Sequence, residues 1–163
     1  MRHALTQQYG LSTSEWAFVY KKGSAPCISN IPDGTYCSLT HSNGIICFVT
    51  SPFPIGIDIE NTSKKRNFVE LANRFMNERE IEQFNKCKKE DLAKYFYSTW
   101  CAKEALYKAT DTPLATQPKN SVILQYLQSS LYWHLLEVNL SEFLVTIVTR
   151  EKPLCIVNNW LPS

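Results

Sequence analysis

The sequence predicts an α+β domain, in which strand-forming segments lie on both sides of a helical middle. Short strand patterns fill much of residues 15–60, amphipathic helix patterns run from residue 68 to residue 109, and strand patterns return after residue 122. The chain has 163 residues, which suffices for one compact domain with its own core.

The first third of the chain predicts one helix followed by short strands. Residues 2–9 fit a helix that Gly10 ends, and residues 15–20 fit a strand. Residues 23–34 are rich in turn formers. Strands are expected at 36–40 and 45–50, joined by the tight loop 41–44, because an Asn-Gly pair is a strong hairpin signal.

The remaining elements follow from changes in periodicity. Residues 55–60 alternate isoleucine with Gly56, Asp58 and Glu60, which is the period of a strand. Helices are then expected at three segments: 68–75, 78–84 and about 90–109. The pattern after Val122 predicts further strands, best defined at 132–138, 143–148 and 154–157.

Composition argues for an ordinary cytoplasmic protein. A net charge of +2 is too small to indicate nucleic-acid or membrane binding. The six cysteines show no CxxC pair and no Cys/His spacing typical of metal ligands, so we expect free thiols in a reducing compartment. The first residues contain no long apolar run, and no window approaches 18 apolar residues, so neither a signal peptide nor a membrane span is expected.

The most specific local signal is the pair Asp58 and Glu60. Residues two apart on a strand share a face, at a spacing of about 6.6 Å. Gly56 lies on the same face, where we expect it to let a ligand approach. Two carboxylates side by side are costly to bury unpaired. A solvent-facing amphipathic strand would explain the same alternation.

The position of Glu104 favours a ligand site over a solvent-facing strand. Leu92, Phe96 and Trp100 recur every four residues along the long helix, and Glu104 continues their apolar stripe. A half-buried carboxylate needs a partner, which Lys108 could supply one turn later as a simple i,i+4 salt bridge. The alternative is a shared ligand. Three carboxylates suit Mg2+, and the nearby Lys103 and Lys108 suit phosphates, so the set favours a metal–polyphosphate site.

Two segments resemble the signature motifs of the 4'-phosphopantetheinyl transferases. Residues 55–60, IGIDIE, match the family's GxDxE, and residues 100–108, WCAKEALYK, match its W-x-x-K-E-x-x-x-K. Their order and separation resemble the longer, surfactin-synthetase-activating type. Residues 40–42, Thr-His-Ser, look like the family's Ser-His-Ser/Thr segment. Residues 23–28 look like its Gly-Lys-Pro region without the lysine, which Lys21 or Lys22 could replace.

The resemblance implies an antiparallel sheet packed with a long helix, and a specific chemistry. It implies a Mg2+ ion held by Asp58, Glu60 and Glu104, with coenzyme A as co-substrate. Its phosphates would meet Lys103 and Lys108, and its 3'-phosphate would meet His41, flanked by Thr40 and Ser42. The implied reaction transfers phosphopantetheine to a carrier-protein serine and releases 3',5'-ADP. Glu104 would be the base, directly or through a water, with Lys108 stabilising charge; a metal-held water is the alternative base.

The longer relatives are built from two similar halves. The resemblance implies one phosphopantetheinyl transferase domain over 1–163, with residues 1–51 as the remnant of an incomplete first half and 52–163 as the second half with the metal site. A shortened enzyme, a homo-oligomer that completes its own cleft, and a start codon placed too late would each explain this.

The expected partners are coenzyme A and an acidic acyl or peptidyl carrier protein, without nucleic acid or membrane. The basic residues at 64–66 and at 86, 88 and 89 could steer such a carrier, although ordinary solvated lysines explain them equally well. Two other functions stay open: a non-catalytic relative that binds coenzyme A or a carrier, and a metal-dependent nuclease that uses Asp58, Glu60 and Lys103.

Overall fold

The computed structural model describes residues 1–19, 27–110 and 121–152. The described residues divide into two compact units, residues 1–35 and residues 36–152. The predicted strand 154–157 lies outside the described residues. Within the described ranges, no helix has both the length and the apolar character needed to cross a membrane.

The first unit contains helix α1 (Arg2–Tyr9) and the short strands β1 (Phe18–Val19) and β2 (Cys27–Ile28). Gly10 ends α1 in the left-handed conformation, as predicted. The buried Trp16 donates its indole N–H to Thr6 Oγ1 at 3.1 Å. The predicted strand 15–20 is too long, because Glu15 closes a turn with Ser12 and pairing begins only at Phe18.

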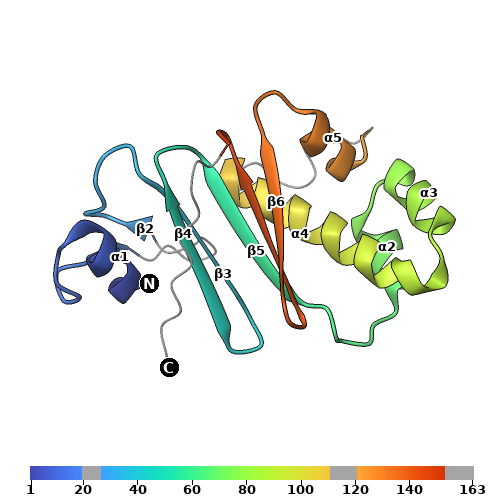
Figure 1. Ribbon diagram of the computed structural model, residues 1–163, viewed down its shortest axis with the longest axis horizontal. Coiled ribbons are helices and arrows are strands. Elements are labelled where there is room, and N and C mark those ends of the chain that lie inside the picture. The colour runs from blue at the N-terminus through green and yellow to red at the C-terminus, as the bar shows by residue number, and fades with distance from the viewer. Residues whose placement is uncertain (20–26, 111–120, 153–163) are drawn as a thin grey trace. The chain divides into compact units, whose positions relative to one another are not determined.

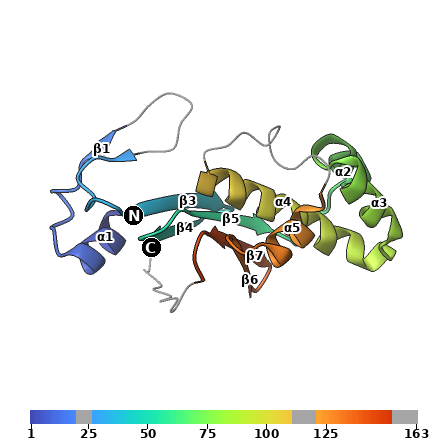
Figure 2. The same ribbon diagram turned by 90° about the horizontal axis from the view of Figure 1, so that it is seen from above.

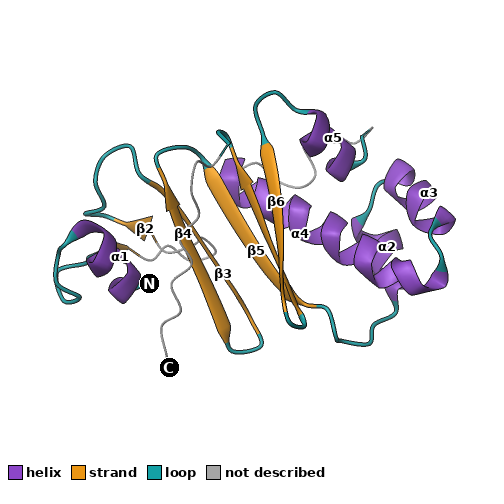
Figure 3. Cartoon of the chain, in the orientation of Figure 1, coloured by secondary structure: helices purple, strands orange, loops and turns teal. Residues whose placement is uncertain are grey.

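The second unit has five strands and four α-helices in its described residues (Figures 1 and 3). The strands are β3 (Tyr36–Ser42), β4 (Ile45–Ser51), β5 (Ile55–Asn61), β6 (His134–Leu140) and β7 (Phe143–Thr149). The helices are α2 (Phe68–Phe75), α3 (Glu78–Lys86), α4 (Leu92–Thr110) and α5 (Ile123–Ser129), and a 3-10 turn, η1 (Lys89–Asp91), precedes α4.

The strands form an antiparallel sheet of order β5-β7-β6 and an antiparallel hairpin β3-β4, and α4 crosses one face of the sheet (Figure 2). This confirms the predicted α+β class. Strand β7 lies in the centre and all its residues are buried. The isoleucines of β5 pack on the other face, against apolar residues of β4. The alternation in residues 55–60 therefore separates an apolar core face from a face that meets α4.

Two predicted segments need correction. The segment after Val122 begins with a helix, α5, because Ile123 and Leu127 are spaced one turn apart and both are buried against α4. The β-branched start of this segment favoured the strand prediction. In the hairpin, strand β3 continues through Ser42, so only Asn43 and Gly44 form the turn, both with positive φ.

Candidate active site

Gly56 packs strand β5 against helix α4. A Cβ atom at this position would lie 1.9 Å from the carbonyl oxygen of Ala105 and 2.7 Å from the backbone nitrogen of Ala109. The expectation that Gly56 makes room for a ligand is therefore wrong: the helix backbone fills that space. This contact brings the last turns of α4, which carry Glu104 and Lys108, close to the acidic face of β5.

Asp58 is the centre of the site. The residue is 6% exposed. Its Oδ1 atom accepts hydrogen bonds from Lys108 Nζ at 2.7 Å and from Thr40 Oγ1 at 3.1 Å. Its Oδ2 atom is buried and has no hydrogen-bond partner among the residues that the structure describes. One oxygen is thus doubly bonded to protein donors, and the other is left for a further ligand.

The side chain of Lys108 bonds to strand β5 rather than to Glu104, its neighbour one turn away on the helix. Its ammonium group pairs with Asp58 and also donates to the carbonyl oxygen of Ile57 at 3.0 Å. In the described part of the chain, no ion pair joins Lys108 to Glu104. The simple i,i+4 salt bridge therefore does not explain this pair of residues. Lys108 instead compensates the buried charge of Asp58.

Glu60 and Glu104 lie within electrostatic reach of Asp58. Burial raises the pKa of Glu104, and the charge of Asp58 raises it further, while Lys108 lowers it. Burial and then the charge of Asp58 also raise the pKa of Glu60, against the opposing charges of Arg66 and Lys64. Three carboxylates from β5 and α4 thus concentrate negative charge in one half-buried place.

The donor chemistry of this place fits a hard divalent cation. Carboxylate oxygens are the ligands that Mg2+ prefers, and the unpartnered Oδ2 atom of Asp58 is a buried acceptor that a cation would satisfy. Asp58, Glu60 and Glu104 would hold such an ion. In the described residues, no group of three or more His, Cys, Asp or Glu side chains is placed so that it could hold a metal ion without some movement of the side chains. The positive charge beside Asp58 is that of Lys108.

Lys103 has a different environment. Its ammonium group pairs with Glu80 at 2.5 Å and donates to the carbonyl oxygen of Phe75 at 3.0 Å. Glu80 is completely buried, and its carboxylate also accepts the backbone N–H groups of Asn77 and Ile123. This network ties α2, α3, α4 and the start of α5 together. The role of Lys103 at phosphates stays a prediction, and it would require Lys103 to exchange these partners.

The side chains of residues 40–42 alternate between two faces, because these residues belong to strand β3. Thr40 is buried and directs its hydroxyl to Asp58, whereas His41 is exposed on the other face and Ser42 is partly buried. The 3'-phosphate role predicted for these residues is open, and Thr40 has an additional partner that the sequence did not reveal.

Sequence reasoning missed three contacts of this site. Thr40 holds Asp58, Ser38 Oγ accepts the backbone N–H of Ile57 at 3.2 Å, and a hydrogen bond from Trp100 lowers the pKa of Glu60. These three contacts have no local sequence signal. The neighbouring Glu80 network does have one, because Asn77-x-x-Glu80 is a capping-box pattern.

A sequence model described as the 4'-phosphopantetheinyl transferase superfamily matches residues 54–153, more than half of the chain. The chain therefore belongs to the 4'-phosphopantetheinyl transferase superfamily.

Curated relatives agree with this assignment. The 4'-phosphopantetheinyl transferase Sfp of Bacillus subtilis (strain 168) is 35% identical over 109 residues, 66% of this chain and 47% of that protein. The 4'-phosphopantetheinyl transferase HetI of Nostoc sp. is 29% identical over 146 residues, 85% of this chain and 62% of that protein. The chain thus spans about half to three-fifths of the length of these relatives.

Proposed function

We propose that this protein transfers the 4'-phosphopantetheine moiety of coenzyme A to a serine of a carrier protein and releases 3',5'-ADP. The observation that carries the proposal is the buried Asp58 carboxylate, bonded by Lys108 and Thr40 on one oxygen and unpartnered on the other, with Glu60 and Glu104 nearby. Family membership and the names of the relatives support the same reaction.

The proposed cofactor is Mg2+, held by Asp58, Glu60 and Glu104. When bound, it would draw negative charge from the phosphate oxygens of coenzyme A, as a Lewis acid does. Burial raises the pKa of both Glu60 and Glu104, and the charge of Asp58 raises both further; a cation would relieve this second, electrostatic cause.

The reaction needs a base and a charge stabiliser. The serine oxygen attacks the β-phosphorus of coenzyme A, the bond from that phosphorus to the bridging oxygen breaks, and 3',5'-ADP leaves with the electron pair. Glu104 would take the serine proton, directly or through a water, and a metal-held water is the alternative base. Lys108, and Lys103 after exchange of its partners, would stabilise charge on the phosphates. His41, exposed on β3, would bind the 3'-phosphate with Thr40 and Ser42 beside it.

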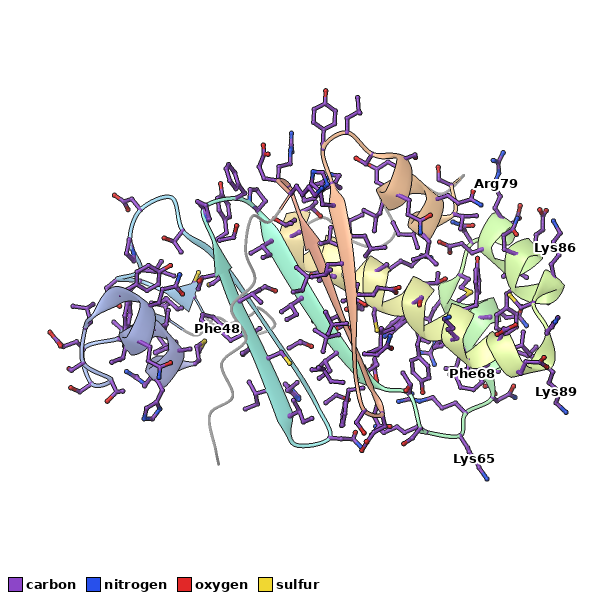
Figure 4. All side chains as sticks on the ribbon, viewed as in Figure 1. Phe48, Lys65, Phe68, Arg79, Lys86 and Lys89 are labelled. Carbon is purple, nitrogen blue, oxygen red and sulfur yellow. The ribbon has the colours of Figure 1, made fainter. Side chains whose placement is uncertain are left out.

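Basic side chains give the α2–α3 end of the second unit a surface suited to an acidic carrier protein. Lys65 precedes α2, and Arg79, Lys86 and Lys89 project outward from α3 and the turn after it (Figure 4). Charge complementarity of this kind steers association rather than fixing affinity. We propose this end as the approach side of the carrier.

A cytoplasmic location is part of the proposal. The cysteines at 27, 47, 87 and 101 are free thiols in the described structure, which fits a reducing compartment.

The direct test incubates the protein with an apo carrier protein, coenzyme A and Mg2+, and measures the carrier mass. We expect the mass of phosphopantetheine to be added only when metal is present. Asp58→Asn and Glu104→Gln should reduce transfer at least 100-fold, because each removes a proposed ligand or base. Parent protein that binds coenzyme A without adding mass to any carrier would instead indicate a non-catalytic binding relative.

A further inference from the structure

We propose that Lys108 is the built-in counter-ion of the metal site, so that a divalent cation and coenzyme A bind cooperatively because each is favoured when Lys108 leaves Asp58. The inference rests on the proposed function, since it concerns the same metal and the same diphosphate. It adds a coupling between metal binding and coenzyme A binding, which neither sequence motif indicates.

The first step of the argument is the burial of Asp58. A carboxylate that is 6% exposed is strongly destabilised unless a cation or several donors compensate it. Among the described residues, Asp58 accepts hydrogen bonds from the ammonium of Lys108 at 2.7 Å and the hydroxyl of Thr40 at 3.1 Å, both on the same oxygen, and also from the buried Cys101 thiol. Of these described donors, Lys108 is the charged one, so it neutralises Asp58.

The second step is the competition that this arrangement creates. A divalent ion bound to Asp58 would stand beside the ammonium of Lys108, and two positive charges on one carboxylate repel each other. Glu60 and Glu104 attract the ion, but the Lys108 charge opposes it for as long as Lys108 donates to Asp58 and to the Ile57 carbonyl. Lys108 thus lowers the metal affinity of the protein alone.

The third step is the release of Lys108. Its side chain is 25% exposed, so it lies at the edge of the site rather than deep within it. An ammonium group offers three donors, and two of them are used by Asp58 and Ile57. The diphosphate of coenzyme A supplies negative oxygens that can take Lys108 over. Each ligand then favours the Lys108 position that the other needs, which is a positive coupling.

The test measures Mn2+ binding from the electron paramagnetic resonance signal of free Mn2+, with the 163-residue chain. Without coenzyme A, Lys108→Met should bind Mn2+ about fivefold or more tightly than the parent, in the range of ordinary site-to-site coupling. With coenzyme A, corrected for Mn2+ held by coenzyme A alone, the difference should vanish or reverse. Lys94→Met is the matched control, since Lys94 is exposed on the same helix, and its Mn2+ affinity should equal that of the parent.

Lys108→Gln guards against misfolding of the methionine variant, because an amide can still donate to Asp58 without charge. It should tighten Mn2+ binding in the same direction. The inference is overturned when neither folded variant binds Mn2+ more tightly than the parent. The carrier mass assay on the parent separates this from the proposed function: transfer by the parent with unchanged variant affinities refutes only the counter-ion role, whereas absence of transfer refutes the function itself.

Discussion

Replacing Gly56 with alanine should separate the two elements that build the site. The new Cβ atom would lie 1.9 Å from the Ala105 carbonyl oxygen, whereas ordinary contacts begin at 3.4 Å, so α4 must move from β5 by about 1.5 Å. The obstacle is backbone, which a change of rotamer cannot relieve. Overpacking of this kind costs about 1–3 kcal/mol of stability.

The same movement would carry Glu104 and Lys108 away from Asp58. Because a displacement of about 1 Å can reduce a rate 100-fold, Gly56→Ala should lower carrier modification by at least about that factor. The assay is the initial rate of phosphopantetheine transfer by mass spectrometry, beside thermal unfolding followed by circular dichroism. The rate should be compared at a temperature where the variant is fully folded.

Ile147→Val serves as the control, because it removes one buried methyl group on the opposite face of the sheet. It should cost about 1 kcal/mol and leave the rate within about twofold of the parent. Gly56→Ala with the parent's melting temperature and rate would refute the claim that close backbone packing assembles the site.

Three other substitutions test individual contacts. Glu104 has a raised pKa, so its stabilising contribution is complete below about pH 4.5 and is lost as pH rises through the folded-state pKa. Without metal, Glu104→Gln should therefore raise the melting temperature at pH 7 and leave it unchanged near pH 4. An unchanged or lower melting temperature at pH 7 would contradict this. Lys103→Met should cost about 3–5 kcal/mol of stability, because it leaves the buried Glu80 charge unpaired. In thermal melts, the double variant with Glu80→Gln should recover part of this loss. Equal stability of the single variant and the parent would exclude the network. Thr40→Val should lower the turnover rate about tenfold or more, because a hydroxyl donor to a carboxylate contributes about 1.5–3 kcal/mol. Thr40→Ser keeps the hydroxyl and should restore the rate. A change confined to the Michaelis constant for coenzyme A would favour the 3'-phosphate role instead.

Periodicity predicted the elements that carry the site. The strand over residues 55–60 and the helix over 68–75 match the structure closely, and the long helix differs by about two residues at its start. These segments are long or strictly periodic, so local pattern and tertiary packing agree. The helix α5 was missed because a short apolar run with β-branched residues does not distinguish a strand from a buried helix.

The partners of the site residues could not be predicted in the same way. Thr40 and Asp58 lie on different strands, and nothing local indicates that β3 runs beside the free edge of β5. The prediction for Gly56 considered only its missing side chain. The residue that occupies the space, Ala105, is 49 positions away in the sequence. Long-range packing decides such contacts.

Helix α4 shows why a sequence motif does not reveal the roles of its members. Lys103 and Lys108 are one and a half turns apart, so they leave the helix in different directions and meet different acids, Glu80 and Asp58. The Glu80 pair is nearly enclosed and ties the helical elements together, whereas the Lys108 member of the Asp58 pair lies at the exposed edge of the site. An ion pair at that edge is exchanged at lower cost than an enclosed one. Of the two lysines, Lys108 is therefore the one whose position a bound diphosphate changes more readily.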